Sequence, residues 1–145
     1  MDPASITALI GVCVTILRNA TGFVSGLDSV ITRIQDASLD ITAVQNRCEG
    51  LSLATRRLRA WLDEEGNQLK EGERAFLMTA LDVCNQLIDK LNGVTRKCGS
   101  VDKKKKPGPW KVVRFLFSQP QLAKYEAALH SQMNSIHVIL RAVNL

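Results

Sequence analysis

Apolar residues recur along most of this chain at alternating steps of three and four, the spacing that places them on one face of an α-helix. The longest unbroken series lies near the amino terminus, and its members are Ile6, Leu9, Cys13, Ile16, Ala20, Phe23, Leu27, Val30 and Ile34. Pro3 precedes it and is tolerated in a first helical turn. The series predicts a helix over about 3–34, and Gly22 and Gly26 favour a kink at about 22–26.

Three more series of the same kind follow. The first predicts a helix over about 38–64, with Ser38 as a candidate cap and Gly66 as a residue whose left-handed conformation would end the helix. The next predicts a helix over about 71–98 that begins with acidic residues, and the last predicts a helix over about 119–143. Their members are Ile41, Val44, Cys48, Leu51, Thr55, Leu58 and Leu62; Leu77, Leu81, Cys84, Ile88, Leu91, Thr95 and Cys98; and Leu122, Tyr125, Leu129, Met133, Ile136, Leu140 and Val143.

The segment before the last helix differs from these. Residues 99–109 predict a basic loop, because adjacent lysines are followed by Pro107 and Pro109. Residues 110–117 predict a short helix, and no stretch alternates apolar and polar residues long enough to predict a strand. Amphipathic segments with short links bury one another's stripes most simply as an antiparallel bundle. We therefore predict one all-α domain over 1–145, an antiparallel helical bundle of four main helices with a short extra helix before the last.

Composition agrees with a single intracellular domain. The chain has 145 residues, of which 46% are hydrophobic and only 5% aromatic, so aliphatic side chains must fill the core. The four cysteines fall on core positions without a C-x-x-C pair, and we interpret them as reduced, buried apolar residues. No basic stretch precedes the first apolar run, so we expect no signal peptide and a cytoplasmic location.

Positive charge is local. The net charge is +5, but residues 96–114 carry +7 and the rest of the chain −2. The lysines at the centre of this patch are Lys103, Lys104, Lys105, Lys106 and Lys111. They could contact anionic lipid, at about 1 kcal/mol per basic residue near a surface, or form a nuclear address or a solvated loop. Only Trp110 offers a stacking surface there, so we do not expect nucleic acid as a partner.

The first helix departs from the amphipathic pattern because no charge occurs between Asp2 and Arg18. The face opposite its stripe holds Ala4, Thr7, Ala8, Gly11, Val14 and Thr15. Residues 3–17 would span about 22 Å, which is shorter than the ~30 Å of a hydrocarbon core. Extension to Leu27 would reach, but Arg18 would then lie inside at about 3 kcal/mol. Two interpretations remain: a central helix surrounded by the other three, or a helix stored in the bundle and released into a membrane.

The sequence holds no pattern typical of catalysis. It has no glycine-rich phosphate loop and no G-x-S-x-G motif. His130 and His137 are seven residues apart, too far to bind one metal ion easily, and Asp63–Glu65 is a charge cluster at a helix end. We therefore expect no enzyme activity, no cofactor and no metal.

Nearly the whole chain resembles a known family, and two segments carry most of the resemblance. The opening Met-Asp-Pro-Ala-Ser-Ile-Thr, followed at once by an uncharged helix, resembles the HeLo-like amino-terminal domains of fungal STAND (NLR-type) receptors. The lysine-bearing loop, the segment Trp110–Phe117 and the long helix ending at Ile136–Leu145 are similar to that domain's closing section. Pro120 departs from the family's lysine- and glutamate-rich pattern at that join.

The resemblance implies a fold and a function. HeLo-like domains are helical bundles, similar to the four-helix bundle of the mixed-lineage kinase domain-like protein. They execute programmed cell death in fungal innate immunity and heterokaryon incompatibility. An upstream NLR or amyloid-type trigger makes them oligomerise, move to the plasma membrane and permeabilise it through the first helix. Carried onto this chain, the membrane-active residues would be Ile6, Leu9, Ile10, Val12, Val14, Ile16 and Leu17.

We therefore expect a regulated cell-death effector that is cytoplasmic until activation, self-associates, and then contacts anionic membrane lipids. Its lysines would meet the lipid headgroups. The alternative is an adaptor module of a fungal NLR-like receptor, which signals by association with other proteins and never inserts into a membrane. Exposure of Thr7, Gly11 and Val14 separates the two readings of the first helix, because tight enclosure would make release costly.

Overall fold

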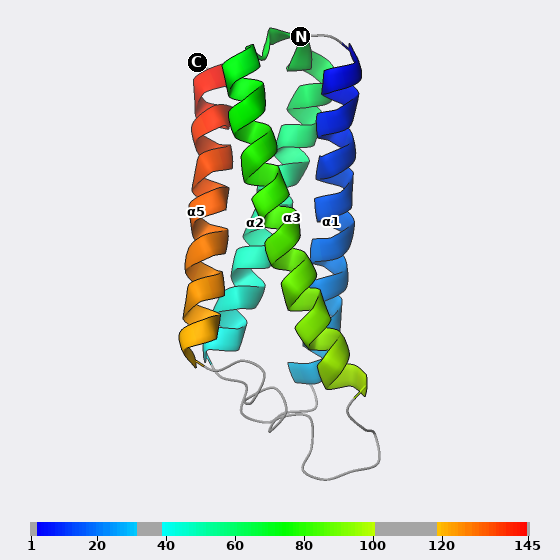
Figure 1. The fold of residues 1–145 in the computed structure, drawn as a ribbon, viewed down its shortest axis with the longest axis vertical. Helices are drawn as coiled ribbons and strands as arrows, with labels where there is room; N and C mark the ends of the chain where they lie inside the picture. The colour runs from blue at the N-terminus through cyan, green and yellow to red at the C-terminus, as the bar shows by residue number, and fades with distance from the viewer. Residues whose placement is uncertain (1–2, 32–38, 101–118, 145) are drawn as a thin grey trace.

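The computed structural model describes residues 3–31, 39–100 and 119–144, and the side chains within 3–27, 42–93 and 123–143. Over these residues the chain is helical and has no strand (Figure 1). The elements are α1 (Pro3–Ile31), α2 (Leu39–Glu65), the 3₁₀ turn η1 (Gly66–Gln68), α3 (Glu71–Ser100) and α5 (Gln119–Asn144). The four helices pack side by side, which confirms the all-α helical bundle. The candidate cap Ser38 and the short helix predicted at 110–117 lie outside the described residues.

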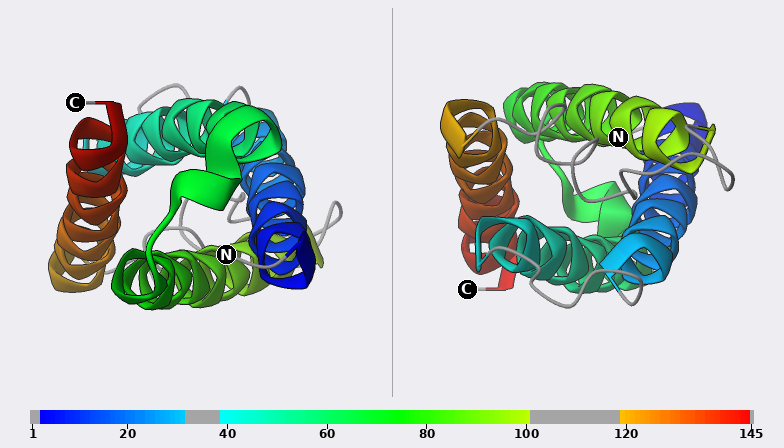
Figure 2. Two further views of the ribbon diagram at one scale, coloured as in Figure 1. Left: turned by 90° about the horizontal axis from the view of Figure 1, so that it is seen from above. Right: turned by 90° about the horizontal axis from the view of Figure 1, so that it is seen from below.

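The helices form a ring. α1 packs against α2 and α3, and α5 packs against the same two helices. Viewed along the bundle, α1 is diagonal to α5 and α2 is diagonal to α3 (Figure 2). Consecutive helices run in opposite directions, but α1 and α3 lie side by side in the same direction, and so do α2 and α5. α1 thus occupies a corner of the bundle rather than its centre.

The predicted stripes form the core. Leu9, Cys13, Ile16, Ala20 and Phe23 of α1 have no exposed surface. The buried members of the other stripes are Val44, Cys48, Leu51, Thr55, Leu58 and Leu62 of α2; Leu77, Leu81, Cys84, Ile88 and Leu91 of α3; and Leu129, Ile136 and Leu140 of α5. The buried Thr55 hydroxyl donates to the Leu51 carbonyl at 2.7 Å, so this polar group is satisfied within its own helix. Spacing alone therefore located the buried face of each helix.

The connection between α2 and α3 crosses one end of the bundle (Figure 2). Within it, Gly66 and Leu69 are buried. A Cβ on Gly66 would lie 3.1 Å from Cγ2 of Ile6, tighter than normal van der Waals contact. The expectation of a left-handed Gly66 is wrong, since its φ lies outside that region. This glycine instead allows the crossing chain to approach the first turn of α1.

The start of α3 follows the predicted electrostatics. Glu71 and Glu73 lie in its first turn, where the helix dipole favours negative charge. The backbone N–H of Lys70 donates to Oε1 of Glu73 at 2.9 Å, so one donor left free by helix geometry is satisfied.

The predicted weak point of the first helix is continuous in the structure. At Gly22 and Gly26, α1 continues without a break from Pro3 to Ile31.

Candidate functional site

The side of α1 that faces away from the bundle carries small, uncharged residues. We call Ala4, Thr7, Ala8, Gly11 and Thr15, all exposed, the outer face of α1. A Cβ added at Gly11 would meet nothing within 4 Å, and Val14 beside it is only half-buried. Thr7, Gly11 and Val14 are therefore not enclosed by other helices, so an uncharged face of α1 lies against solvent in the folded bundle.

The two hydroxyl groups on this outer face are already hydrogen-bonded. The Oγ1 of Thr7 donates to the Pro3 carbonyl at 2.8 Å, and that of Thr15 donates to the Gly11 carbonyl at 3.0 Å. Each donor is satisfied by its own helix, so neither would be left unpaired if water were removed. The outer face can therefore enter an apolar environment without losing a hydrogen bond to water from these donors.

The residues predicted to be membrane-active are buried or half-buried in the folded bundle. Leu9 and Ile16 have no exposed surface. Ile6, Ile10, Val12, Val14 and Leu17 are half-buried. Leu9 and Ile16 could thus reach lipid only after the helix leaves its place in the bundle.

The length and composition of α1 would allow it to cross a membrane. Among the described residues it is the one helix that meets this test, over Pro3–Leu27, and 28% of its most apolar stretch is buried in the bundle. Core helices of soluble proteins and signal sequences meet the same test, so the length and composition of α1 are compatible with membrane insertion but do not require it.

Two sets of contacts hold α1 at different heights. At its first turn, Ile6 packs on Gly66 of the crossing connection. Farther along, the Asn92 side chain donates to the Asn19 carbonyl at 3.1 Å, and the Asn19 amide donates to Oδ1 of Asp89 at 3.4 Å. Both Asn92 and Asp89 belong to α3, so polar contacts fix α1 against its parallel neighbour. Arg18, one residue before Asn19, is exposed.

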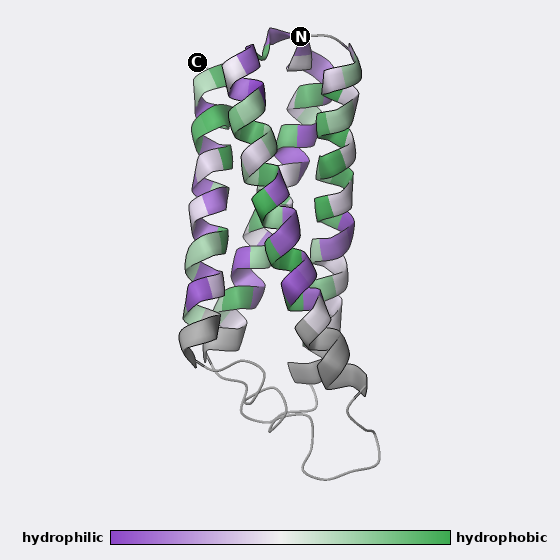
Figure 3. Cartoon of the chain, in the orientation of Figure 1, coloured by the Kyte–Doolittle hydropathy of each residue, from purple (hydrophilic) through white to green (hydrophobic). Residues whose placement is uncertain are grey.

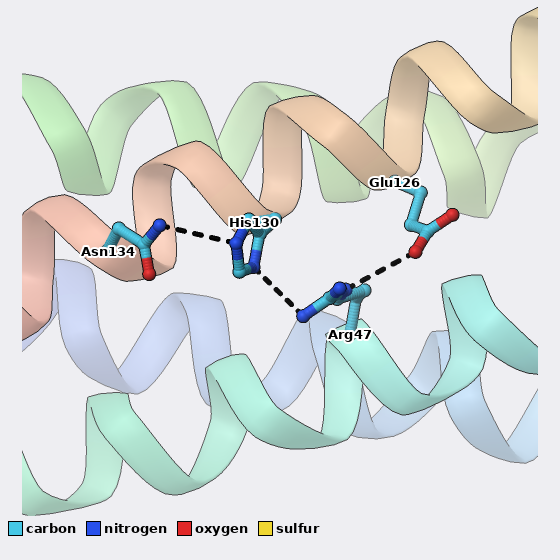
Figure 4. Close-up of polar contacts among 4 residues, drawn as sticks. All are labelled: Arg47, Glu126, His130 and Asn134. Atoms are coloured by element: carbon cyan, nitrogen blue, oxygen red, sulfur yellow. Dashed lines mark hydrogen bonds and ion pairs between the residues drawn. The ribbon is translucent and has the colours of Figure 1, made fainter.

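A separate polar cluster joins α2 to α5 (Figure 4). Nη1 of Arg47 lies 2.9 Å from Nδ1 of His130, and Nε of Arg47 lies 3.5 Å from Oε1 of Glu126. Because a guanidinium can only donate, Nδ1 of His130 accepts this hydrogen bond. On the other side of the ring, Nε2 of His130 lies 3.3 Å from Nδ2 of Asn134. This cluster orders α5 on α2 and does not involve α1.

Open grooves on the surface of the described residues include two that border α2. The larger, of about 850 Å³, runs between α2 and α5 and is lined by Arg57, Ala60, Trp61, Glu64, His137, Leu140 and Arg141. The smaller, of about 360 Å³, runs between α1 and α2 and is lined by Thr21, Val24, Ser25, Glu49, Ser52, Leu53 and Arg56. Leu53 at its edge is 61% exposed, the most exposed large apolar side chain described.

The three described cysteines are buried free thiols in α1, α2 and α3. Burial raises the pKa of Cys13, Cys48 and Cys84 to about 12 each. Thiolates form least readily there, so these residues behave as small apolar side chains rather than nucleophiles. The side chain of Cys98 lies outside the described residues.

The remaining predicted features are the candidate lysine contacts and the two histidines. Lys103–Lys106 and Lys111, the candidate lipid contacts, lie outside the described residues. His130 is exposed and His137 half-buried, and no group of three or more histidine, cysteine or acidic side chains in the described parts could hold a metal ion. Sequence reasoning missed the Arg47–His130 contact, because nothing in the helical spacing says which helices are neighbours.

No protein-family model, no curated protein and no solved structure matches this chain. The resemblance to HeLo-like domains therefore stays a prediction that rests on the quoted segments. What the structure adds is the exposure of one face of α1.

Proposed function

We propose that this chain is an effector domain of regulated cell death that permeabilises the plasma membrane. In this proposal α1 leaves the bundle, inserts into the bilayer and self-associates there. The observation that carries the proposal is the outer face of α1, an uncharged surface of small residues on the one described helix long and apolar enough to cross a membrane. The HeLo-like resemblance of the amino terminus supplies the biological setting.

The energetics require a trigger. Leu9, Ile16, Phe23 and Leu27 are fully buried or nearly so, and each contributes about 1.5–3 kcal/mol through burial. Their exposure to water would cost on the order of 10 kcal/mol, similar to the ~5–15 kcal/mol that holds a whole domain together. α1 therefore stays in the bundle until lipid replaces the lost contacts, which gives a resting and an active state.

The small residues of the outer face suit the inserted state. Membrane helices associate through close packing at alanine, glycine and threonine, because lipid provides no hydrophobic force between helices. Arg18 would cost about 3 kcal/mol near the middle of a single spanning helix. An oligomer lowers that cost when charged side chains line a water-filled centre. Self-association on insertion follows from both features.

The experiment compares dye leakage from vesicles of phosphatidylcholine and phosphatidylserine for the wild type and Gly11→Glu. Position 11 is exposed and open, so the variant should fold normally. A carboxylate in the inserted helix costs about 3 kcal/mol, so we expect leakage to fall at least tenfold. Gly72→Glu is the matched control, since Gly72 of α3 is also exposed with nothing within 4 Å, and it should leak like the wild type.

The lysines 103–106 and 111 are proposed contacts for the anionic headgroups. Charge attraction of this kind weakens as salt rises, because the Debye length shortens to about 8 Å at 0.15 M. Because the lysines are proposed to bind anionic headgroups, vesicles without phosphatidylserine should leak less.

The adaptor alternative predicts a different set of results. Neither kind of vesicle should leak, Gly11→Glu should not change the location of the protein in the cell, and a pull-down should yield stable protein complexes.

A further inference from the structure

We propose that two folded copies of this chain associate through the α1–α2 face, around a two-fold axis level with Ser52 and Leu53. This proposal concerns the bundle with α1 in place, and it is independent of membrane insertion. The partner is a second copy of this chain. Three observations carry the proposal: an exposed leucine beside a groove, a self-complementary pair of charges, and the extent of the face.

Leu53 is the apolar anchor. It is 61% exposed and lies at the edge of the groove of about 360 Å³ between α1 and α2. On the α1 side the groove is lined by Thr21, Val24 and Ser25, which leave room for a side chain from outside. When two such faces meet, the grooves lie opposite each other and the two Leu53 side chains fill the shared space. A few residues near the centre of an interface carry most of its binding energy.

The charges around Leu53 favour a second copy of the same face. Glu49, Leu53 and Arg56 share one side of α2, since their steps are four and three. Neither Glu49 nor Arg56 forms an ion pair within the described part of the chain. They lie at equal distances on either side of the midpoint between Ser52 and Leu53. A two-fold axis in the interface, perpendicular to α2 at that midpoint, therefore sets each Glu49 opposite Arg56 of the second copy.

The same operation produces no clash of charge along α2. It brings Arg59 level with Asn46 of the second copy and Asp63 level with Thr42, all of which are exposed. Like charges brought together would oppose association, and charge complementarity of this kind fixes the register of an interface. The pattern is thus antiparallel and specific, with two ion pairs flanking an apolar centre.

The α1–α2 face is large enough to form a stable interface between two copies. α2 has 27 residues and is about 40 Å long at 1.5 Å per residue. Two adjacent helices present a surface about 20 Å wide, so the α1–α2 face offers about 800 Å². That area is typical of one side of a stable protein–protein interface. Such a contact covers the part of α1 that lines the groove.

Sedimentation velocity on the full chain at about 50 µM and low salt tests the proposal. We expect the wild type to be a dimer. Glu49→Arg and Arg56→Glu should each weaken the dimer at least tenfold, because each sets like charges opposite each other. The double variant E49R/R56E should dimerise like the wild type. An equimolar mixture of the two single variants should also form a dimer, since both ion pairs are restored between unlike copies.

Controls separate loss of the interface from loss of the fold. Leu53→Asp should be a monomer with an unchanged helical circular dichroism spectrum. Val138→Asp is the matched control, because Val138 is 56% exposed but lies on α5, away from the interface. It should remain a dimer. A monomeric wild type, or a double variant and a mixture that both stay monomeric, would overturn the proposal without bearing on vesicle leakage.

Discussion

Three thiols show how burial controls the chemistry of single residues in this bundle. Cys13, Cys48 and Cys84 have no exposed surface, and loss of water around each raises its pKa from 9.0 to about 12. Helical spacing alone assigned these cysteines to the core. Spacing could not predict the role of Gly66, because that role depends on close packing against Ile6, which lies 60 residues earlier in the chain.

The raised pKa of these thiols predicts a loss of stability in alkali. Below pH 9 each thiol is protonated in both states, whereas between about pH 9 and 12 the unfolded chain releases protons that the folded chain retains. At pH 10 each thiol disfavours the fold by about 1.4 kcal/mol, so the free energy of unfolding should fall by about 4 kcal/mol from pH 8 to pH 10. Urea unfolding at pH 8 and at pH 10 measures this fall in the free energy of unfolding.

The variant Cys84→Ala controls for other groups that titrate in the same range. With one buried thiol removed, the loss in the free energy of unfolding between pH 8 and pH 10 should shrink by about a third. Equal losses in the wild type and the variant would show that the thiols do not cause the effect.

At the level of helices, the stripes predicted which residues each helix buries but not which helix covers them. Leu9, Cys13 and Ile16 were placed correctly in the core because their spacing matches the helical period. The diagonal position of α2 and α3 was not predictable, since it depends on the path of the connection after Glu65. The exposure of the outer face of α1 follows from this arrangement, because only two helices flank α1.

Two glycines weaken α1 without serving its packing. Gly11 and Gly22 are exposed in the helix interior, and a Cβ at either would meet nothing within 4 Å. Replacement by alanine reduces the freedom of the unfolded chain, so Gly11→Ala and Gly22→Ala should each raise the free energy of unfolding by about 0.5–1 kcal/mol. Urea unfolding of the single and double variants measures this gain.

Gly50→Ala is the matched comparison on α2. Its Cβ would lie 3.2 Å from the sulfur of Met133 on α5, so side-chain movement offsets the gain in helix stability. We expect little or no stabilisation there. A gain at Gly50 as large as at Gly11 would mean that packing around these glycines does not decide the result.

For the whole molecule, the arrangement gives α1 two kinds of neighbour. Its buried stripe contacts α2 and α3, while its outer face contacts solvent in a single copy of the bundle. One end is held by Ile6 on the crossing connection, and the middle is held by Asn19 on α3. Insertion must break both contacts. A covalent link at the first contact would therefore block release of α1 while leaving the rest of the surface unchanged.

The pair Ile6→Cys and Gly66→Cys provides that link. Cγ1 and Cγ2 of Ile6 lie 3.6 and 3.1 Å from the position of a Cβ on residue 66, which places the two Cβ atoms about 4 Å apart, within the range of a disulfide. Cys13, Cys48 and Cys84 are buried and protonated, so they should not compete for the bond, and a Cys98→Ser background removes the remaining thiol. If α1 inserts, the oxidised protein should cause no vesicle leakage and should regain it when a reductant cleaves the link. Equal leakage from the oxidised and reduced forms, with the disulfide verified by mass, would show that permeabilisation does not need the first turn of α1 to leave the bundle.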